Sequence, residues 1–168
     1  EMALCLVGSE MCIRDRMQER QASILNEAWN ARQPNLPINT KQEALILASI
    51  IEKETSLKTE RGKVSSVFVN RLLREIALQT DASVVYGITR GKKVLGRGLR
   101  RSELKKDTPW NTYVNKGLPP SPIGNPGKAS IHAALNPDIT NYLYFVADGS
   151  GGHAFAENLR EHNINVAK

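Results

Sequence analysis

The sequence has little cysteine, few aromatic residues and no long hydrophobic segment among its 168 residues. Its two cysteines, Cys5 and Cys12, lie close to the N-terminus, so the rest of the chain offers no disulfide, no thiol nucleophile and no cysteine ligand for zinc. The three histidines, His132, His153 and His162, form no close pair at metal-ligand spacing. No glycine-rich nucleotide signature precedes an expected helix. We therefore expect neither a metal ion nor a cofactor.

Aromatic residues make up 5% of the sequence, which argues against a surface on which nucleic-acid bases stack. No apolar run approaches the roughly 20 residues of a membrane-spanning helix. Lys and Arg together number 23 against 17 Asp and Glu, which gives a net charge of +6 and favours an anionic partner. The basic stretch 90–101 could contact phosphates, but a run of charge usually forms a solvated surface. Nucleic-acid binding is therefore supported by charge alone.

Residues 1–16 show neither helical nor strand periodicity. The segment from Leu6 to Arg16 matches, codon by codon, the translation of a common transposase-type sequencing adapter. We expect 1–16 to be such an artefact, to lie outside the native protein and to pack against nothing. The native part would then be 17–168, truncated on its N-terminal side. An unstructured native tail is the alternative.

Apolar periodicity and capping chemistry predict a helical first half. Thr40 and Glu43 have capping-box spacing ahead of an apolar stripe, which predicts a helix that ends near Thr55. Further helices are expected over 18–32, after Thr59, from an Asp81 cap to Tyr86, from Ser102, from Asn125-Pro126 to Ala134, and over 157–166.

The second half of the chain has a different character. Residues 87–127 are rich in glycine and proline, which predicts a long structured loop. A strand over 142–147 is followed by a glycine-rich turn and His153-Ala154-Phe155, which predicts a hairpin. We interpret His153, at the end of that hairpin, as structural rather than ligand-binding. The expected fold is α+β: a helical first half, a long structured loop, and a small C-terminal β-hairpin followed by a helix.

One carboxylate stands out in the helix that follows Thr40. Leu47, Ile51 and Glu54 occur at i, i+4 and i+7, so Glu54 continues the apolar stripe, whereas Glu52 lies toward the outer face. Burial and the negative end of the helix would both favour the protonated form of Glu54. A protonated carboxyl at neutral pH is what a general acid for glycoside cleavage requires. From spacing alone, a solvated glutamate at a helix end is the favoured alternative.

Nine short segments, in order between Gln42 and Asn163, resemble the endolytic murein transglycosylase family (MltG/YceG-like). They are Ala48-Ser49-Ile50-Ile51-Glu52-Lys53-Glu54-Thr55, Val67-Phe68-Val69-Asn70-Arg71-Leu72, Leu78-Gln79-Thr80-Asp81, Val85-Tyr86-Gly87, Asn111-Thr112-Tyr113, Gly117-Leu118-Pro119-Pro120, Asn125-Pro126-Gly127, Tyr142-Leu143-Tyr144-Phe145-Val146 and Gly151-Gly152-His153-Ala154-Phe155. Each segment is a weak signal alone, but their common order is a strong one.

The resemblance implies a lyase that cleaves peptidoglycan strands between N-acetylmuramic acid and N-acetylglucosamine and leaves 1,6-anhydro ends. It implies a helical part that resembles a lysozyme-like catalytic core, with 17–168 as the catalytic domain. Family members usually carry an N-terminal membrane anchor and a LysM-like region. The expected location is therefore the outer, periplasmic face of the bacterial cytoplasmic membrane, beside the cell-wall synthesis machinery, where the enzyme would terminate glycan elongation. The positive charge suits stem peptides that carry carboxylates, and no nucleic-acid partner is expected.

The family's catalytic glutamate maps onto Glu54. Most glycosidases use two carboxylates, whereas a transglycosylase needs one, because the sugar's own C6 hydroxyl attacks the anomeric carbon. Glu54 would protonate the leaving oxygen and then accept the hydroxyl proton. Uncharged donors in loop-like segments, Gln79, Asn111, Tyr113 and Asn125, are candidate substrate-binding residues. Hydrogen bonding within turns and caps is an equally good interpretation of each.

Three other functions remain open. A hydrolytic muramidase would use Glu54 as the acid and Asp81 as the base. A non-catalytic peptidoglycan-binding module would retain the groove without the chemistry. A nucleic-acid binder rests on charge only.

Overall fold

The computed structural model describes residues 2–168, with side chains from residue 12 onward. Over these residues it is an α+β fold of seven helices and one two-stranded antiparallel sheet, which confirms the expected class. The elements are α1 (Met2–Asn30), α2 (Lys41–Glu54), α3 (Arg61–Leu73), α4 (Asp81–Thr89), α5 (Arg101–Lys105), α6 (Lys128–Leu135), β1 (Tyr144–Ala147), β2 (His153–Ala156) and α7 (Leu159–Val166). Between α4 and α6 the chain has only the short α5, in the segment where a long loop was expected.

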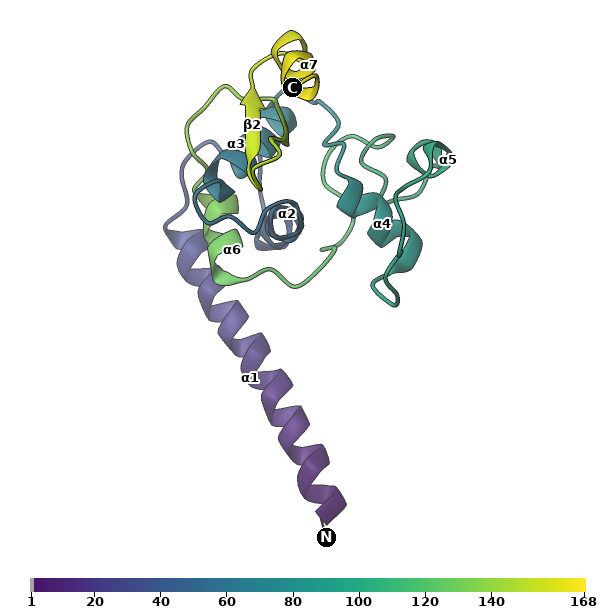
Figure 1. The fold of residues 1–168 in the computed structure, drawn as a ribbon. Coiled ribbons are helices and arrows are strands. Elements are labelled where there is room, and N and C mark those ends of the chain that lie inside the picture. The colour runs from purple at the N-terminus through teal and green to yellow at the C-terminus, as the bar shows by residue number, and fades with distance from the viewer. Residues whose placement is uncertain (1) are drawn as a thin grey trace.

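Helix α2 is the centre of the core. Figure 1 shows it nearly end-on, with α6 and α3 against it and the α4–α5 lobe on the other side. Leu47, Ile50 and Ile51 have no exposed surface, as expected for a helix covered on most sides. The predicted capping box is present: Thr40 Oγ1 accepts from the Glu43 amide at 3.1 Å, and the Glu43 carboxylate accepts from the Thr40 amide at 3.3 Å.

Helix α1 is longer than the sequence indicated. The apolar stripe expected in 18–32 is confirmed, because Leu25 and Ala28 are buried against the core. The helix nevertheless begins at Met2 rather than near Gln18, and its first half projects away from the body (Figure 1). Side chains 12–16 are exposed. Whether the apolar side chains of 2–11 pack against anything lies outside the described residues.

Two expected helix starts were placed wrongly. Asp81 is the first residue of α4, Thr80 precedes it as the cap, and no side-chain hydrogen bond closes that end. Helix α6 begins at Lys128 with Gly127 as its N-cap, two residues after the Asn125-Pro126 pair. The reason is Glu52 on α2, whose carboxylate accepts from the Gly127 amide at 3.1 Å and from the Ser130 hydroxyl at 2.5 Å. A carboxylate from another element caps this helix, and local sequence does not reveal such a cap.

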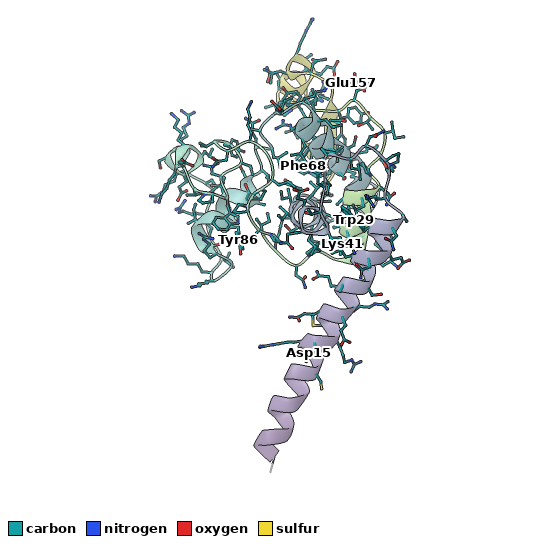
Figure 2. All side chains as sticks on the ribbon, turned by 180° about the vertical axis from the view of Figure 1, so that it is seen from behind. Asp15, Trp29, Lys41, Phe68, Tyr86 and Glu157 are labelled. Carbon is teal, nitrogen blue, oxygen red and sulfur yellow. The ribbon has the colours of Figure 1, made fainter. Side chains whose placement is uncertain are left out.

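The predicted hairpin is confirmed, with Tyr144 opposite Ala156 and Phe145 opposite Phe155. Phe145 meets Phe68 of α3 edge to face, with ring centroids 5.9 Å apart, and this contact seats the sheet on the helices. Phe68 lies in the main body in Figure 2, and Tyr86 lies on α4, where it packs against the edge of the same core. Helix α7 packs against both strands of the hairpin.

Glu60 holds the tip of the hairpin. Its carboxylate accepts from the His153 amide at 3.0 Å and lies 2.8 Å from His153 Nδ1. A Cβ on Gly152 would lie 2.8 Å from Glu60 Oε1, so a side chain there would displace the carboxylate. These contacts give His153 a structural role, as expected.

Candidate active site

A cleft of about 430 Å³ opens where the end of α2, the face of α3, the start of α4, the loop at Tyr113, the hairpin and α7 meet. Its polar lining comes from Glu54, Arg71, Gln79, Thr80, Asp81, Tyr113, Tyr144 and His162. Phe68, Leu78, Phe145 and Leu159 supply its apolar surface. A cleft with apolar walls and a few convergent polar groups is typical of a ligand site.

Glu54 is the last residue of α2, and the apolar stripe of that helix carries it to the edge of the core. Its side chain is partly buried. The Thr80 hydroxyl donates a hydrogen bond to Glu54 Oε1. Thr80 is itself fixed by hydrogen bonds, since its amide donates to Thr112 Oγ1 at 3.1 Å. The carboxyl therefore has a defined position at the wall of the cleft.

The surroundings of Glu54 raise its pKa above the ordinary value. Burial is the largest cause, because it removes water from the charged form, and the nearby negative charge of Asp81 acts in the same direction. The hydrogen bond from Thr80 and the charge of His153 oppose the shift without cancelling it. The position of Glu54 on the apolar stripe predicted a raised pKa, and this direction of the shift is confirmed. Such a carboxyl can donate a proton at a pH where ordinary glutamates are ionised.

Asp81 and Tyr113 form a pair in the cleft lining. The Tyr113 hydroxyl donates to Asp81 Oδ1 at 2.6 Å. Burial, followed by this hydrogen bond, raises the pKa of Tyr113 well above its ordinary value, so the phenol stays protonated across the physiological range. Asp81 was expected to cap the helix that follows it. Its carboxylate instead accepts this hydrogen bond from Tyr113.

Gln79 adopts a left-handed backbone conformation with φ of 55° at the mouth of the cleft. Its amide donates to the carbonyl of Thr112 at 3.0 Å, which ties it to the Tyr113 loop. Its side-chain oxygen accepts from Arg71 Nη1 at 3.1 Å. The side chain is exposed, and its NH₂ group has no partner among the described residues. Gln79 and Tyr113 are therefore the two expected binding residues that share the cleft with Glu54.

Asn111 and Asn125 do not line the cleft. Asn111 is fully buried, and its NH₂ group donates to the carbonyls of Glu103, Leu104 and Lys106. Its Oδ1 accepts from the Tyr113 amide at 2.9 Å, so it shapes the loop that carries Tyr113. Asn125 lies between α1 and the start of α6, where its Oδ1 accepts from the Gln21 side chain at 2.5 Å.

Arg71 and Thr80 line the cleft but were not among the site residues predicted from the sequence. The sequence nevertheless contains an indication of each. Val64, Phe68 and Arg71 repeat the i, i+4, i+7 spacing that marks Glu54, and Arg71 is accordingly 7% exposed on the buried face of α3. Thr80 stands beside Gln79 in one of the motif segments, but its contact with Glu54 is 26 residues distant in sequence.

Among residues 12–168 no cluster of three or more potential metal ligands is present.

Taken together, these features define an α+β domain whose cleft presents one carboxyl suited to proton donation. The chain belongs to the YceG-like family, whose model matches residues 8–168. It is 47% identical over 120 residues to the endolytic murein transglycosylase of Bacillus subtilis (strain 168), an alignment that covers 71% of this chain and 32% of that protein. It is 36% identical over 140 residues to the endolytic murein transglycosylase of Streptococcus pneumoniae (strain D39), covering 80% of this chain and 24% of that protein.

A solved structure gives the same picture. The crystal structure of a YceG-like protein from Listeria monocytogenes superposes with a TM-score of 0.66 at 41% identity, over 74% of this chain and 38% of that one. The chain thus spans about a third or less of the curated relatives that it matches. Within the described residues no helix combines the length and the hydropathy that crossing a membrane requires.

Proposed function

We propose that this chain carries the catalytic part of an endolytic peptidoglycan lytic transglycosylase, with Glu54 as its one proton-transfer residue. The observation that carries the proposal is the partly buried Glu54 carboxyl, whose pKa the cleft raises, next to the hydroxyl of Thr80. The two relatives named endolytic murein transglycosylase support the substrate class. The helices around Glu54 would act as a lysozyme-like core.

The reaction needs two proton transfers at the same carboxyl. Protonated Glu54 donates to the glycosidic oxygen as the bond from the muramic acid C1 breaks, and the sugar passes through an oxocarbenium-like state. The C6 hydroxyl of the same sugar then bonds to C1, and its proton moves to the Glu54 carboxylate. The products are a 1,6-anhydro end and a free 4-hydroxyl, with no water consumed. Thr80 stabilises the intermediate carboxylate by its hydrogen bond.

The remaining polar groups would position the strand. The NH₂ group of Gln79 and the hydroxyl of Tyr113 are the donors on the cleft surface that suit a sugar and its N-acetyl group. Asn111 would act indirectly by holding Tyr113. Asn125, outside the cleft, would contact substrate only if a long strand extended over α6.

The location in the cell is proposed from the substrate class. An enzyme that cuts murein works in the cell envelope, and we propose the periplasmic side of the cytoplasmic membrane, next to the synthesis machinery whose strands it would terminate. A membrane contact would require a segment other than the helices described.

A muramidase is the second candidate, and one observation favours it. Asp81 lines the same cleft as Glu54, and its charge contributes to the raised pKa of Glu54. Two nearby carboxylates are the arrangement that hydrolytic glycosidases use. A binding module without catalysis is the third candidate.

Product mass separates these functions. Purified chain is incubated with peptidoglycan, and soluble products are analysed by mass spectrometry. Anhydro products weigh one water less than hydrolytic ones, and a binding module gives none. The Glu52→Gln variant is the matched control, because it lies two residues away on α2, faces α6, and its amide oxygen can still accept from Gly127 and Ser130. Products with free reducing ends, one water heavier than the anhydro products, would replace the transglycosylase by the muramidase as the function of the wild-type chain.

A further inference from the structure

Arg71 is an unusual residue for the wall of this cleft. It is 7% exposed, yet no acidic side chain pairs with it among the described residues. Its Nε donates to the Leu143 carbonyl at 2.6 Å, and its Nη1 donates to the carbonyls of Ala77 and Leu78 at 3.0 and 3.1 Å. These bonds position the guanidinium without neutralising it. A buried cation without a counter-ion is costly unless something else supplies the negative charge.

The second terminal nitrogen of Arg71 remains available. Nη2 has no hydrogen-bond partner among the described residues, and it is not among the polar atoms sealed from solvent. Arg71 is one of the residues that line the cleft. Burial lowers the pKa of Arg71, and the titratable groups acting on it are Tyr144 and Tyr113 rather than a carboxylate. A guanidinium stays charged even so.

His162 of α7 also lines the cleft. Its ring stacks on Tyr144 with centroids 5.2 Å apart, and the guanidinium carbon of Arg71 lies 5.0 Å from the centroid of the same Tyr144 ring. His162 Nε2 has no hydrogen-bond partner among the described residues, and, unlike Nδ1, it is not among the polar atoms sealed from solvent. An accessible ring nitrogen without a protein partner on the lining of the cleft can contact a ligand atom.

We propose that Arg71, Tyr144 and His162 form a subsite for the free carboxylate of a stem peptide attached to muramic acid, separate from the bond-cleaving Glu54. This inference rests on the proposed function and deepens it. A planar guanidinium edge and an imidazole N–H are suited to the two oxygens of a carboxylate. The two acids of the cleft, Glu54 and Asp81, would repel such a group from their end of the cleft, which orients the strand. The enzyme would thus select strands that carry peptides over bare glycan.

Three forms of the same glycan strand test the proposal: strands with stem peptides, strands whose peptide carboxyls have been converted to primary amides, and strands stripped of peptide. Binding is measured by co-sedimentation with the Glu54→Gln variant, which removes cleavage from the readout. We expect peptide-bearing strands to bind roughly tenfold more tightly than the other two, the size of effect that one charged hydrogen-bonded contact gives. Equal binding of all three forms overturns the subsite.

Variants assign the effect to residues. In the Glu54→Gln background, His162→Ala should remove about a 3–10-fold preference for the peptide-bearing form and leave stripped strands unaffected. His132→Ala is the matched control, since His132 lies on α6 outside the cleft lining. Arg71→Lys should keep the charge and part of the preference, whereas Arg71→Gln should abolish the preference. Melting curves identify any variant that fails to fold, and His162→Ala then carries the test.

The outcomes separate this proposal from the function on which it rests. If wild-type chain releases no product but the Glu54→Gln variant still prefers peptide-bearing strands, the subsite stands and the catalytic proposal fails. If products form and His162→Ala weakens binding of all three strand forms equally, the catalytic proposal stands and the histidine is merely structural.

Discussion

Replacing Glu54 with glutamine separates catalysis from folding in this cleft. The amide keeps the shape of the side chain and can accept the Thr80 hydrogen bond through its oxygen, but it transfers no proton. Since one carboxyl performs both transfers in the proposed reaction, kcat should fall on the order of 10²- to 10⁴-fold, the range that general acid–base groups contribute. At 1.36 kcal/mol per tenfold, this is a loss of about 2.7–5.4 kcal/mol in transition-state stabilisation.

The same substitution should stabilise the fold at neutral pH. Because the folded-state pKa of Glu54 lies above its ordinary value of 4.5, the folded wild type binds its proton more tightly than the unfolded chain does. That advantage is complete below the unfolded pKa and is lost as the pH rises through the folded pKa. The neutral amide has no such pH dependence. Each unit of upward shift corresponds to about 1.4 kcal/mol. A gain on the order of 1 kcal/mol would raise Tm by about 2–4 °C in a chain of this size.

Thermal melts of wild type and Glu54→Gln between pH 3 and pH 8 check the predicted gain in stability. Product analysis of the same two proteins checks the predicted loss of kcat. The Tm difference should be near zero in acid and should grow to a plateau above the folded-state pKa. The Glu52→Gln control should show the opposite sign at neutral pH, because hydrogen bonds hold the pKa of Glu52 below its ordinary value. A Glu54→Gln variant that folds, melts like wild type at every pH and cleaves with more than a tenth of the wild-type rate would refute the assignment.

Three further outcomes are expected. Asp81→Asn should retain anhydro products with a rate within about tenfold of wild type, because the amide oxygen still accepts from Tyr113; a loss as deep as that of Glu54→Gln, with intact fold, would favour the muramidase. Gly152→Ala should lower Tm by about 2–4 °C, because its Cβ would lie 2.8 Å from the Glu60 oxygen that holds the hairpin. Deleting residues 1–16 should leave the urea midpoint unchanged within the equivalent of about 0.5 kcal/mol, since the described side chains 12–16 are exposed; a clear loss would show that the segment contributes to the core.

Local chemistry explains what could be predicted. The capping box at Thr40 and the apolar spacing up to Glu54 are contained within about fifteen residues, so the start, the buried face and the last residue of α2 all follow from neighbouring positions. The hairpin was equally accessible, since its glycine turn and two apolar strands are adjacent in sequence.

Long-range contacts explain what could not be predicted. Asp81 has good N-cap chemistry, but its carboxylate is taken by Tyr113, 32 residues further on. The start of α6 depends on Glu52, 75 residues before Gly127. Asn111 looks like a free amide in a loop, and only the fold shows that three backbone carbonyls occupy its NH₂ group. For Asp81 and for the start of α6 a partner distant in sequence decides the outcome, whereas for Asn111 the conformation of its own loop does.

The position of Glu54 at the end of a buried stripe suits a group that must work in both of its charge states. In the proposed reaction the apolar end of α2 favours the protonated carboxyl that would begin the cycle, and the Thr80 hydroxyl favours the carboxylate that would persist until the C6 hydroxyl attacks. A site that was only apolar would hold the proton too tightly to release it, and a site with several donors would keep the carboxylate and never protonate it. Asp81 contributes to this balance through its charge while one of its own oxygens is occupied by Tyr113. In the proposed reaction Asp81 thus acts only through its charge, which raises the pKa of Glu54, and Glu54 alone transfers protons.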